Sequence, residues 1–414
     1  MVRRTRRISV AGFLILSFFP IYMIGASKRT GIHDEAPSWR LDLRPMGFVE
    51  KSERRTRYVS DTRISFIRED LLLGSFWTES TPGGCTWKEK AGPDRCRLHA
   101  VEIEVGTGRI TSTHEWSFPF REGFIYPNGR GSFILSWDNE LDLYSSNFEE
   151  SKKVLLPSAE PGLPMLFIHV SPSGRTLLAD WIARKTLPQT VGAKTARKSA
   201  QREIPQESHT IFATDDMKEL RQWDENLFTK SVSDNLLVAT TGFDFTSLSR
   251  PGFLISRFNE HGWHDLYMTR NWLSTEVKLL DDQRVVVQER NRVAVLNTEG
   301  ASLFEDTTFR KQQYLSGDPV TSADGLRFAV AVWVDAPHPF WVSPVSVQAE
   351  LLVYDVPQRS RIYTLPLDMT TQVGNLWALH DFALSPDGSL LAHTADGLVE
   401  LYHLPRGKSA CHTA

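Results

Sequence analysis

Apolar and polar residues follow a pattern that recurs along the chain: an apolar run, a tight polar turn centred on serine, and a second apolar run. The pattern is clearest at residues 167–179 and 382–392, where the turns read Ser-Pro-Ser-Gly and Ser-Pro-Asp-Gly. A third copy at residues 322–330 has the turn Ser-Ala-Asp-Gly. Proline sets φ at the second turn position and Asp-Gly or Ser-Gly closes the turn, so each copy predicts a β-hairpin between two buried strands.

Weaker copies of the same pattern fill the rest of the chain at a fairly regular step. Each has turn-forming or charged residues followed by an apolar run, at residues 68–73, 126–135, 233–238 and 281–287. With the three strong copies they make seven hairpins. The repeat is roughly 40 to 60 residues, which is the length of a propeller blade.

Alternating strands follow several of these hairpins, at residues 101–110, 293–300 and 352–357. Period-two alternation indicates strands of small antiparallel sheets. Long helical periodicity is absent outside the N-terminal segment, so the predicted fold class is all-β. Seven similar units without Pro/Ser/Gly-rich linkers favour one β-propeller of seven four-stranded blades over separate sandwiches, because in a ring each sheet covers its faces against its neighbours.

The last unit supplies only three strands, which raises the question of how the ring closes. These strands are expected at residues 382–384, 390–394 and 398–404. The segment 39–43 alternates suitably for the missing fourth strand. We therefore expect this N-terminal strand to pair with the final blade and close the ring.

The hairpins with Ser-Pro-Asp-Gly and Ser-Pro-Ser-Gly turns, together with the Tyr-Asp-Val strand end at residues 354–356, resemble the WD-repeat-like, YVTN-type and quinoprotein-dehydrogenase-like β-propellers. The resemblance covers about residues 38–405. No Trp-Asp dipeptide stands at each blade end, and three of the seven hairpins keep the fuller turn. The resemblance implies the fold, and since this superfamily includes scaffolds, ligand binders, hydrolases and dehydrogenases, it carries over no function.

The N-terminal residues have the plan of an export signal. Four arginines precede residues 8–26, which contain no charged side chain and end in Ile-Gly-Ala. Residues 1–26 are predicted to be either a cleaved signal peptide or an uncleaved membrane anchor, and residues 27–37 a short linker. In both cases we expect an extracytoplasmic propeller, periplasmic or secreted, with membrane contact only through residues 8–26. Residues 406–414 read as a polar C-terminal tail.

Composition and cysteine usage narrow the possible partners. The formal net charge is −3, whereas nucleic-acid-binding domains are strongly basic, so no nucleic-acid partner is expected. Cys85 and Cys96 are predicted to form a local disulfide, with two free thiols as the alternative. No Cys or His pair has the spacing of a zinc site, so no metal is expected. The sequence has no phosphate loop or dinucleotide fingerprint, and no cofactor is expected.

Candidate ligand-binding residues lie in or just ahead of first strands, which approach the axial channel of a propeller. They are His169, Asp318, His380 and Asp381. The His-Asp pair could act as a general base with its orienting carboxylate, or it could hydrogen-bond neighbouring turns and hold the blades in register. A proline-rich segment, 335–344, carries Phe340 and Trp341, which could cap the propeller or dock a partner.

Two classes of function follow. The favoured one is an exported binding or scaffolding module for a protein or a polysaccharide, without chemistry of its own, and catalytic residues are accordingly unknown. The alternative is a propeller enzyme, a hydrolase or an oxidoreductase, with residues that converge on the channel. Three or more titratable groups with shifted pKa values in an axial pocket would argue against the module without chemistry, and a channel filled with apolar side chains would argue against the enzyme.

Overall fold

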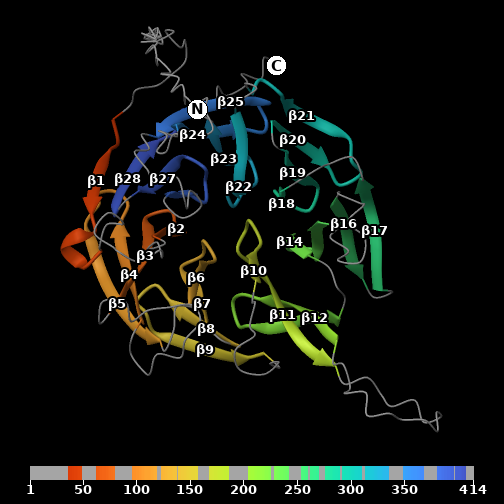
Figure 1. Cartoon of the computed structure of the whole chain (residues 1–414), viewed down its shortest axis with the longest axis horizontal. Helices are drawn as coiled ribbons and strands as arrows, with labels where there is room; N and C mark the ends of the chain where they lie inside the picture. Colours follow the sequence, from red (N-terminus) through yellow and green to blue (C-terminus); the bar gives the residue numbers. More distant parts are fainter. Residues whose placement is uncertain are drawn as a thin grey trace, which may run out of the picture. The chain divides into compact units, whose positions relative to one another are not determined.

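The computed structural model describes one compact unit within His33–Ala414. The described residues are 36–48, 62–79, 96–118, 123–137, 139–156, 167–185, 204–224, 228–241, 253–259, 262–269, 276–289, 291–309, 313–334, 348–367, 380–395 and 397–406. They form seven four-stranded antiparallel sheets, arranged as the blades of a β-propeller (Figure 1). All seven predicted hairpins join the first two strands of a blade, so the predicted fold class is confirmed.

Blades 1 to 4 follow the chain in order, each running from its innermost strand outward. Their strands are β2 (Arg63–Arg68), β3 (Leu71–Glu79), β4 (Cys96–Glu104) and β5 (Ile110–Phe118) in blade 1; β6 (Phe124–Pro127), β7 (Ser132–Trp137), β8 (Glu140–Ser145) and β9 (Glu150–Leu155) in blade 2; β10 (Phe167–Val170), β11 (Thr176–Lys185), β12 (Ile204–Ala213) and β13 (Lys218–Asp224) in blade 3; and β14 (Phe228–Val232), β15 (Leu237–Thr241), β16 (Phe253–Asn259) and β17 (Gly262–Thr269) in blade 4.

Blades 5 and 6 continue the same order, and blade 7 borrows its outermost strand from the N-terminal side of the unit. The strands are β18 (Glu276–Leu279), β19 (Arg284–Glu289), β20 (Arg292–Asn297) and β21 (Ser302–Asp306) in blade 5; β22 (Gln313–Thr321), β23 (Arg327–Val334), β24 (Gln348–Asp355) and β25 (Ser360–Leu367) in blade 6; and β26 (His380–Leu384), β27 (Leu390–Ala395), β28 (Leu398–His403) and β1 (Trp39–Asp42) in blade 7. A short 3-10 helix, η1 (Arg44–Met46), follows β1.

The N-terminal strand closes the ring of blades, as the sequence predicts. Strand β1 pairs antiparallel with β28, with Trp39 opposite Leu401 and Asp42 opposite Leu398. The Trp39 indole nitrogen donates a hydrogen bond of 2.7 Å to the carbonyl of Val105 in blade 1. Beyond β1, Leu43 is fully buried between the first and last blades. The N-terminal strand therefore completes blade 7 and also ties it to blade 1.

The recurrent serine turns fix the contacts between successive blades. In the turn of blade 3 the Ser171 hydroxyl accepts a hydrogen bond from the Thr176 amide, 3.1 Å, and donates one to Asp234 of blade 4, 2.8 Å. Gly174 has φ +73°, and a Cβ there would lie 1.5 Å from the carbonyl oxygen of Asn128 in blade 2. Glycine is required at this position by both its conformation and the close approach of the neighbouring turn.

Candidate functional site

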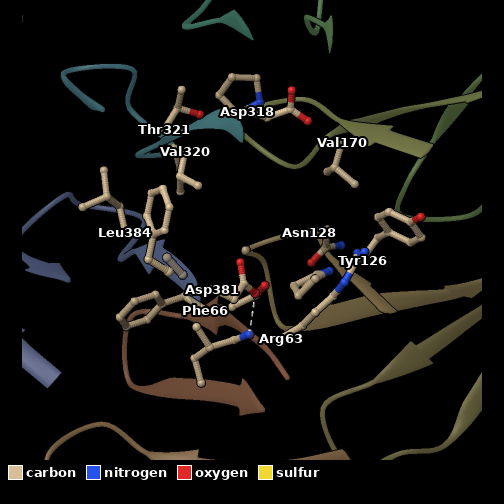
Figure 2. A pocket seen from close by; sticks show the side chains of 18 of the residues that line it. Arg63, Phe66, Tyr126, Asn128, Val170, Asp318, Val320, Thr321, Asp381 and Leu384 are labelled. Carbon is tan, nitrogen blue, oxygen red and sulfur yellow. Dashed lines mark hydrogen bonds between the residues drawn. The ribbon is translucent and has the colours of Figure 1, made fainter. Parts of the chain in front are cut away.

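The innermost strands surround an axial cavity of about 660 Å³. Six strands, β2, β6, β10, β18, β22 and β26, contribute its walls, so the cavity is lined by residues from six of the seven blades. Both apolar and polar side chains line it, and the labelled Arg63, Asp318 and Asp381 reach it from different strands (Figure 2). The channel is therefore a pocket with charged walls and is not filled by apolar side chains.

A bulge in β22 places Asp318 in the cavity. The pairing of β22 with β23 shifts between Ser316 and Val320, so that the segment 317–319 has no regular partner. Gly317 takes φ +78°, and its carbonyl accepts a hydrogen bond of 3.0 Å from the side-chain amide of Gln288. Bulges redirect side chains at functional sites. Here Asp318, which we expected just ahead of the first strand, lies within it at the point where the strand departs from regular pairing.

A row of alternating charges runs along the wall of blades 4, 5 and 6. The Lys230 ammonium lies 2.8 Å from a carboxylate oxygen of Glu276, and the Glu276 and Asp318 side chains are hydrogen-bonded. Burial and the charge of Asp318 raise the pKa of Glu276. Burial also acts to raise the pKa of Asp318, but the hydrogen bond with Glu276 and the charges of Lys230 and Lys278 outweigh it, so the net shift is downward. Channel solvent reaches the Asp318 side chain although the walls enclose it.

Lys278 stands two residues after Glu276 on β18 and lines the cavity. Burial lowers the pKa of its ammonium group, while the negative charge of Asp318 acts in the opposite direction. Val277 and Leu279, which alternate with these charged residues, are buried in the core between blades 4 and 5. The alternation of β18 thus places its two charged residues on the face opposite that core.

A second polar cluster lies behind the wall at blades 3 and 4. The Asp180 carboxylate is 2.7 Å from Nδ1 of His209, and it accepts a hydrogen bond from the hydroxyl of Thr229. His169 lines the cavity with Nε2 at 3.9 Å from Asp180, and this nitrogen is buried without a hydrogen-bond partner among the described residues. Burial lowers the pKa of His169, which keeps the imidazole neutral near pH 7.

The opposite wall carries Arg63 and Asp381. The Asp381 carboxylate accepts a hydrogen bond of 2.8 Å from the backbone amide of Ile64, drawn as a dashed line in Figure 2, and thereby links blade 7 to blade 1. Burial raises the pKa of Asp381 against the effect of the nearby Arg63 charge. Arg63 packs over the ring of Phe124 at 4.7 Å and shares a hydrogen bond with the Tyr126 hydroxyl.

Three of the residues singled out in the sequence, His169, Asp318 and Asp381, line the cavity together. His380 begins β26, where its backbone pairs opposite Ala395, and its side chain is outside the described part of the structure. The residues Phe340, Trp341 and Cys85 also lie outside the described ranges. Cys96 is fully buried at the start of β4, and its pairing with Cys85 stays a prediction.

Sequence reasoning missed the charged residues Lys230, Glu276 and Lys278. The signal that could have found them is the innermost position of their strands, because any polar residue on a first strand lies close to the axis. Such a residue either faces the channel or must be satisfied between blades.

At least three titratable groups with shifted pKa values, those of His169, Lys278 and Asp318, converge on one cavity. Such convergence is the feature that argues against a binding module without chemistry, so an enzyme stays a candidate beside a ligand-binding channel. Over the described residues, no group of three or more His, Cys, Asp or Glu side chains is placed to hold a metal ion. The same described ranges contain no helix with the length and apolarity needed to cross a membrane.

The molecule is thus a seven-bladed β-propeller with a charged axial channel. No protein-family model and no curated protein matches its sequence. Among solved structures it is similar to an acylaminoacyl peptidase of Pyrococcus horikoshii, with a TM-score of 0.52 and 10% identity over 86% of this chain and 53% of that one. The β-propeller domain of the trilobed protease of Pyrococcus furiosus gives a TM-score of 0.48 and 10% identity, covering 86% and 99%. The WD40 domain of Neurospora crassa Pan2 gives 0.47 and 8%, covering 91% and 98%. At these identities the likeness shows the fold alone.

Proposed function

We propose that the protein is a ligand-binding propeller whose axial channel takes a small polar molecule, or the end of a glycan or polypeptide chain. The observation that carries this proposal is the convergence of His169, Lys278, Asp318 and Asp381 on a cavity of about 660 Å³. Ligand pockets are typically about 300 to 1,000 Å³, with a few convergent polar groups set among apolar walls. A cavity of this kind holds a molecule of roughly disaccharide or dipeptide size.

The test is a thermal-shift and calorimetry screen of the purified propeller with neutral and charged monosaccharides, disaccharides and dipeptides. Thr321, which lines the channel, is replaced by Trp to fill it. The matched control is Thr113→Trp, on the exposed side of the outermost strand β5. Ligands that stabilise the wild type and the control, but not Thr321→Trp, support the proposal. Ligands that bind all three proteins equally would place the binding site elsewhere.

An enzyme is the second candidate, favoured by the Glu276 and Asp318 pair. The two carboxyl groups share a hydrogen bond and their pKa values are shifted in opposite directions. Pairs whose environments push their pKa values apart are suited to acid and base roles. Prolonged incubation with any channel ligand, followed by mass spectrometry, separates the candidates: a new product that Glu276→Gln abolishes while binding persists indicates catalysis, and an unchanged ligand indicates binding alone.

Export remains part of the proposal. It is supported by the arginine-rich start, the uncharged segment 8–26, and the Cys85 and Cys96 pair. N-terminal sequencing of the protein from a cell envelope or culture medium distinguishes cleavage after residue 26 from an intact anchor. Peptide mapping without reduction tests the disulfide, and recovery of the two cysteines as free thiols would contradict it.

A further inference from the structure

The charged side chains along the Lys278 wall are not all paired. Lys230 is paired with Glu276 at 2.8 Å, and Glu276 is in turn hydrogen-bonded to Asp318. Lys278 is the second cation of this wall. No carboxylate among the described residues lies within ion-pair distance of its ammonium group, and the Asp318 carboxylate that influences it is already engaged by Glu276.

An enclosed cation without a partner is costly, because a charge removed from bulk water loses solvation that a neighbouring anion must replace. Burial lowers the pKa of Lys278 for this reason. His169, which faces the same cavity, adds no balancing negative charge. Lys278 therefore faces the cavity with no ion-pair partner among the described residues, and an anionic group of a ligand can pair with it there.

We propose that Lys278 is the recognition residue for a single carboxylate of the channel ligand, so that the ligand is a small acidic molecule such as a uronic acid or the C-terminal end of a peptide. This inference rests on the proposed function. One unpaired ammonium group matches one negative charge, whereas the neighbouring Asp318 carboxylate repels the second charge of a phosphate dianion. On the other wall, Arg63 and Asp381 carry opposite formal charges, and the charge of Arg63 acts on the pKa of Asp381.

The experiment compares pairs of probes that differ in the carboxylate alone. The pairs are glucuronate with glucose, and glycylglycine with its C-terminal amide, each titrated calorimetrically into the wild type, Lys278→Met and Lys278→Arg. We expect the wild type to bind the acid of one or both pairs. The neutral analogue should bind more weakly by about tenfold or more. Lys278→Met removes that difference and Lys278→Arg keeps most of it. The acid that binds identifies whether the source is a sugar or a peptide.

Folding and location are controlled separately. Lys218→Met, on the exposed start of β13, is the matched control for lost charge, and circular dichroism with a melting curve confirms that each variant folds. Thr321→Trp reports whether a bound probe occupies the channel. Neutral and acidic probes that bind equally and are both excluded by Thr321→Trp would overturn the carboxylate inference and leave the channel function standing. If Thr321→Trp changes the binding of no probe, both the carboxylate inference and the proposed channel function are overturned.

Discussion

The junction between blades 7 and 1 and the junction between blades 3 and 4 are built differently. Among the described residues, the core at the 7/1 junction contains fourteen buried apolar side chains, including Leu43 and Phe48. The described part of the 3/4 junction contributes four buried apolar side chains to its core. The 3/4 junction also holds the polar cluster of Asp180, His209 and Thr229. The 7/1 junction is thus closed by an extensive apolar core, whereas the described residues of the 3/4 junction combine a small apolar core with a buried polar cluster.

This difference bears on how each junction is held together. Apolar packing needs no partner of defined direction, so it suits a seam that must hold the ring together. Each polar group between blades needs a hydrogen-bond partner of its own. The Nε2 atom of His169 has no such partner among the described residues, and His169 lines the cavity. Four sets of substitutions test what holds each of these regions together.

The largest effect is expected at the closure. Leu43→Ala removes a fully buried side chain from the 7/1 core and should lower the free energy of unfolding by about 3 to 4 kcal/mol. Urea denaturation followed by circular dichroism measures it. Leu155→Ala, at a side chain that is 64% exposed on β9, is the control and should change the free energy by less than about 0.5 kcal/mol. Equal effects of the two substitutions would show that the closure is not a major source of stability.

A somewhat smaller effect is expected at the polar junction. Asp180→Ala leaves the His209 ring and the Thr229 hydroxyl without their acceptor and should cost about 2 to 3 kcal/mol. Asp70→Ala, at an exposed turn, is the matched control and should be nearly neutral. If Asp180→Ala behaves like the control in denaturation, the polar cluster does not hold blades 3 and 4 together.

The turns at the 7/1 junction should make stability depend on pH. Burial and the charge and hydrogen bond of Asp387 raise the pKa of Glu69 to about 7. Because the folded-state pKa lies above the unfolded value, this group favours folding below about pH 4.5 and the benefit is lost as pH rises through 7. Glu69→Gln should therefore flatten the decline in melting temperature between pH 5 and 8. Glu219→Gln, on exposed β13, should leave the slope unchanged, and an unchanged slope in both variants would contradict the assignment.

The smallest effect is expected at the channel wall. Lys278→Met removes an enclosed cation without an ion-pair partner among the described residues, so it should leave stability unchanged or raise it, within about 1 kcal/mol. Lys218→Met should be neutral. A marked loss of stability in Lys278→Met would mean that the ammonium group holds the wall together, and its availability to a ligand would then be in doubt.

The sequence predicts the scaffold well, because its turns are local. Ser171, Ser322 and Ser385 all stand in turns between the first two strands of their blades, and the strand that begins at Trp39 completes blade 7. The site is predicted only in part. Nothing local marks the displacement of Asp318 by the β22 bulge, and the Glu-Val-Lys-Leu pattern of β18 reads as an ordinary alternating strand. Only the ring brings Lys278 and His169 to one cavity, since they belong to different blades.

The pairing of β1 with β28 also sets the order in which the molecule can be completed. Trp39 and Leu401 are neighbours in the sheet although 362 positions separate them along the chain. At a synthesis rate of about 5 to 20 residues per second, the first strand waits roughly 20 to 70 s for its partner. During that interval the apolar face of blade 1, which later packs against blade 7, has no cover and can associate with other chains. Completion of the ring is thus a late, long-range step, and the yield of folded protein should depend on how well the growing chain is shielded until its end has emerged.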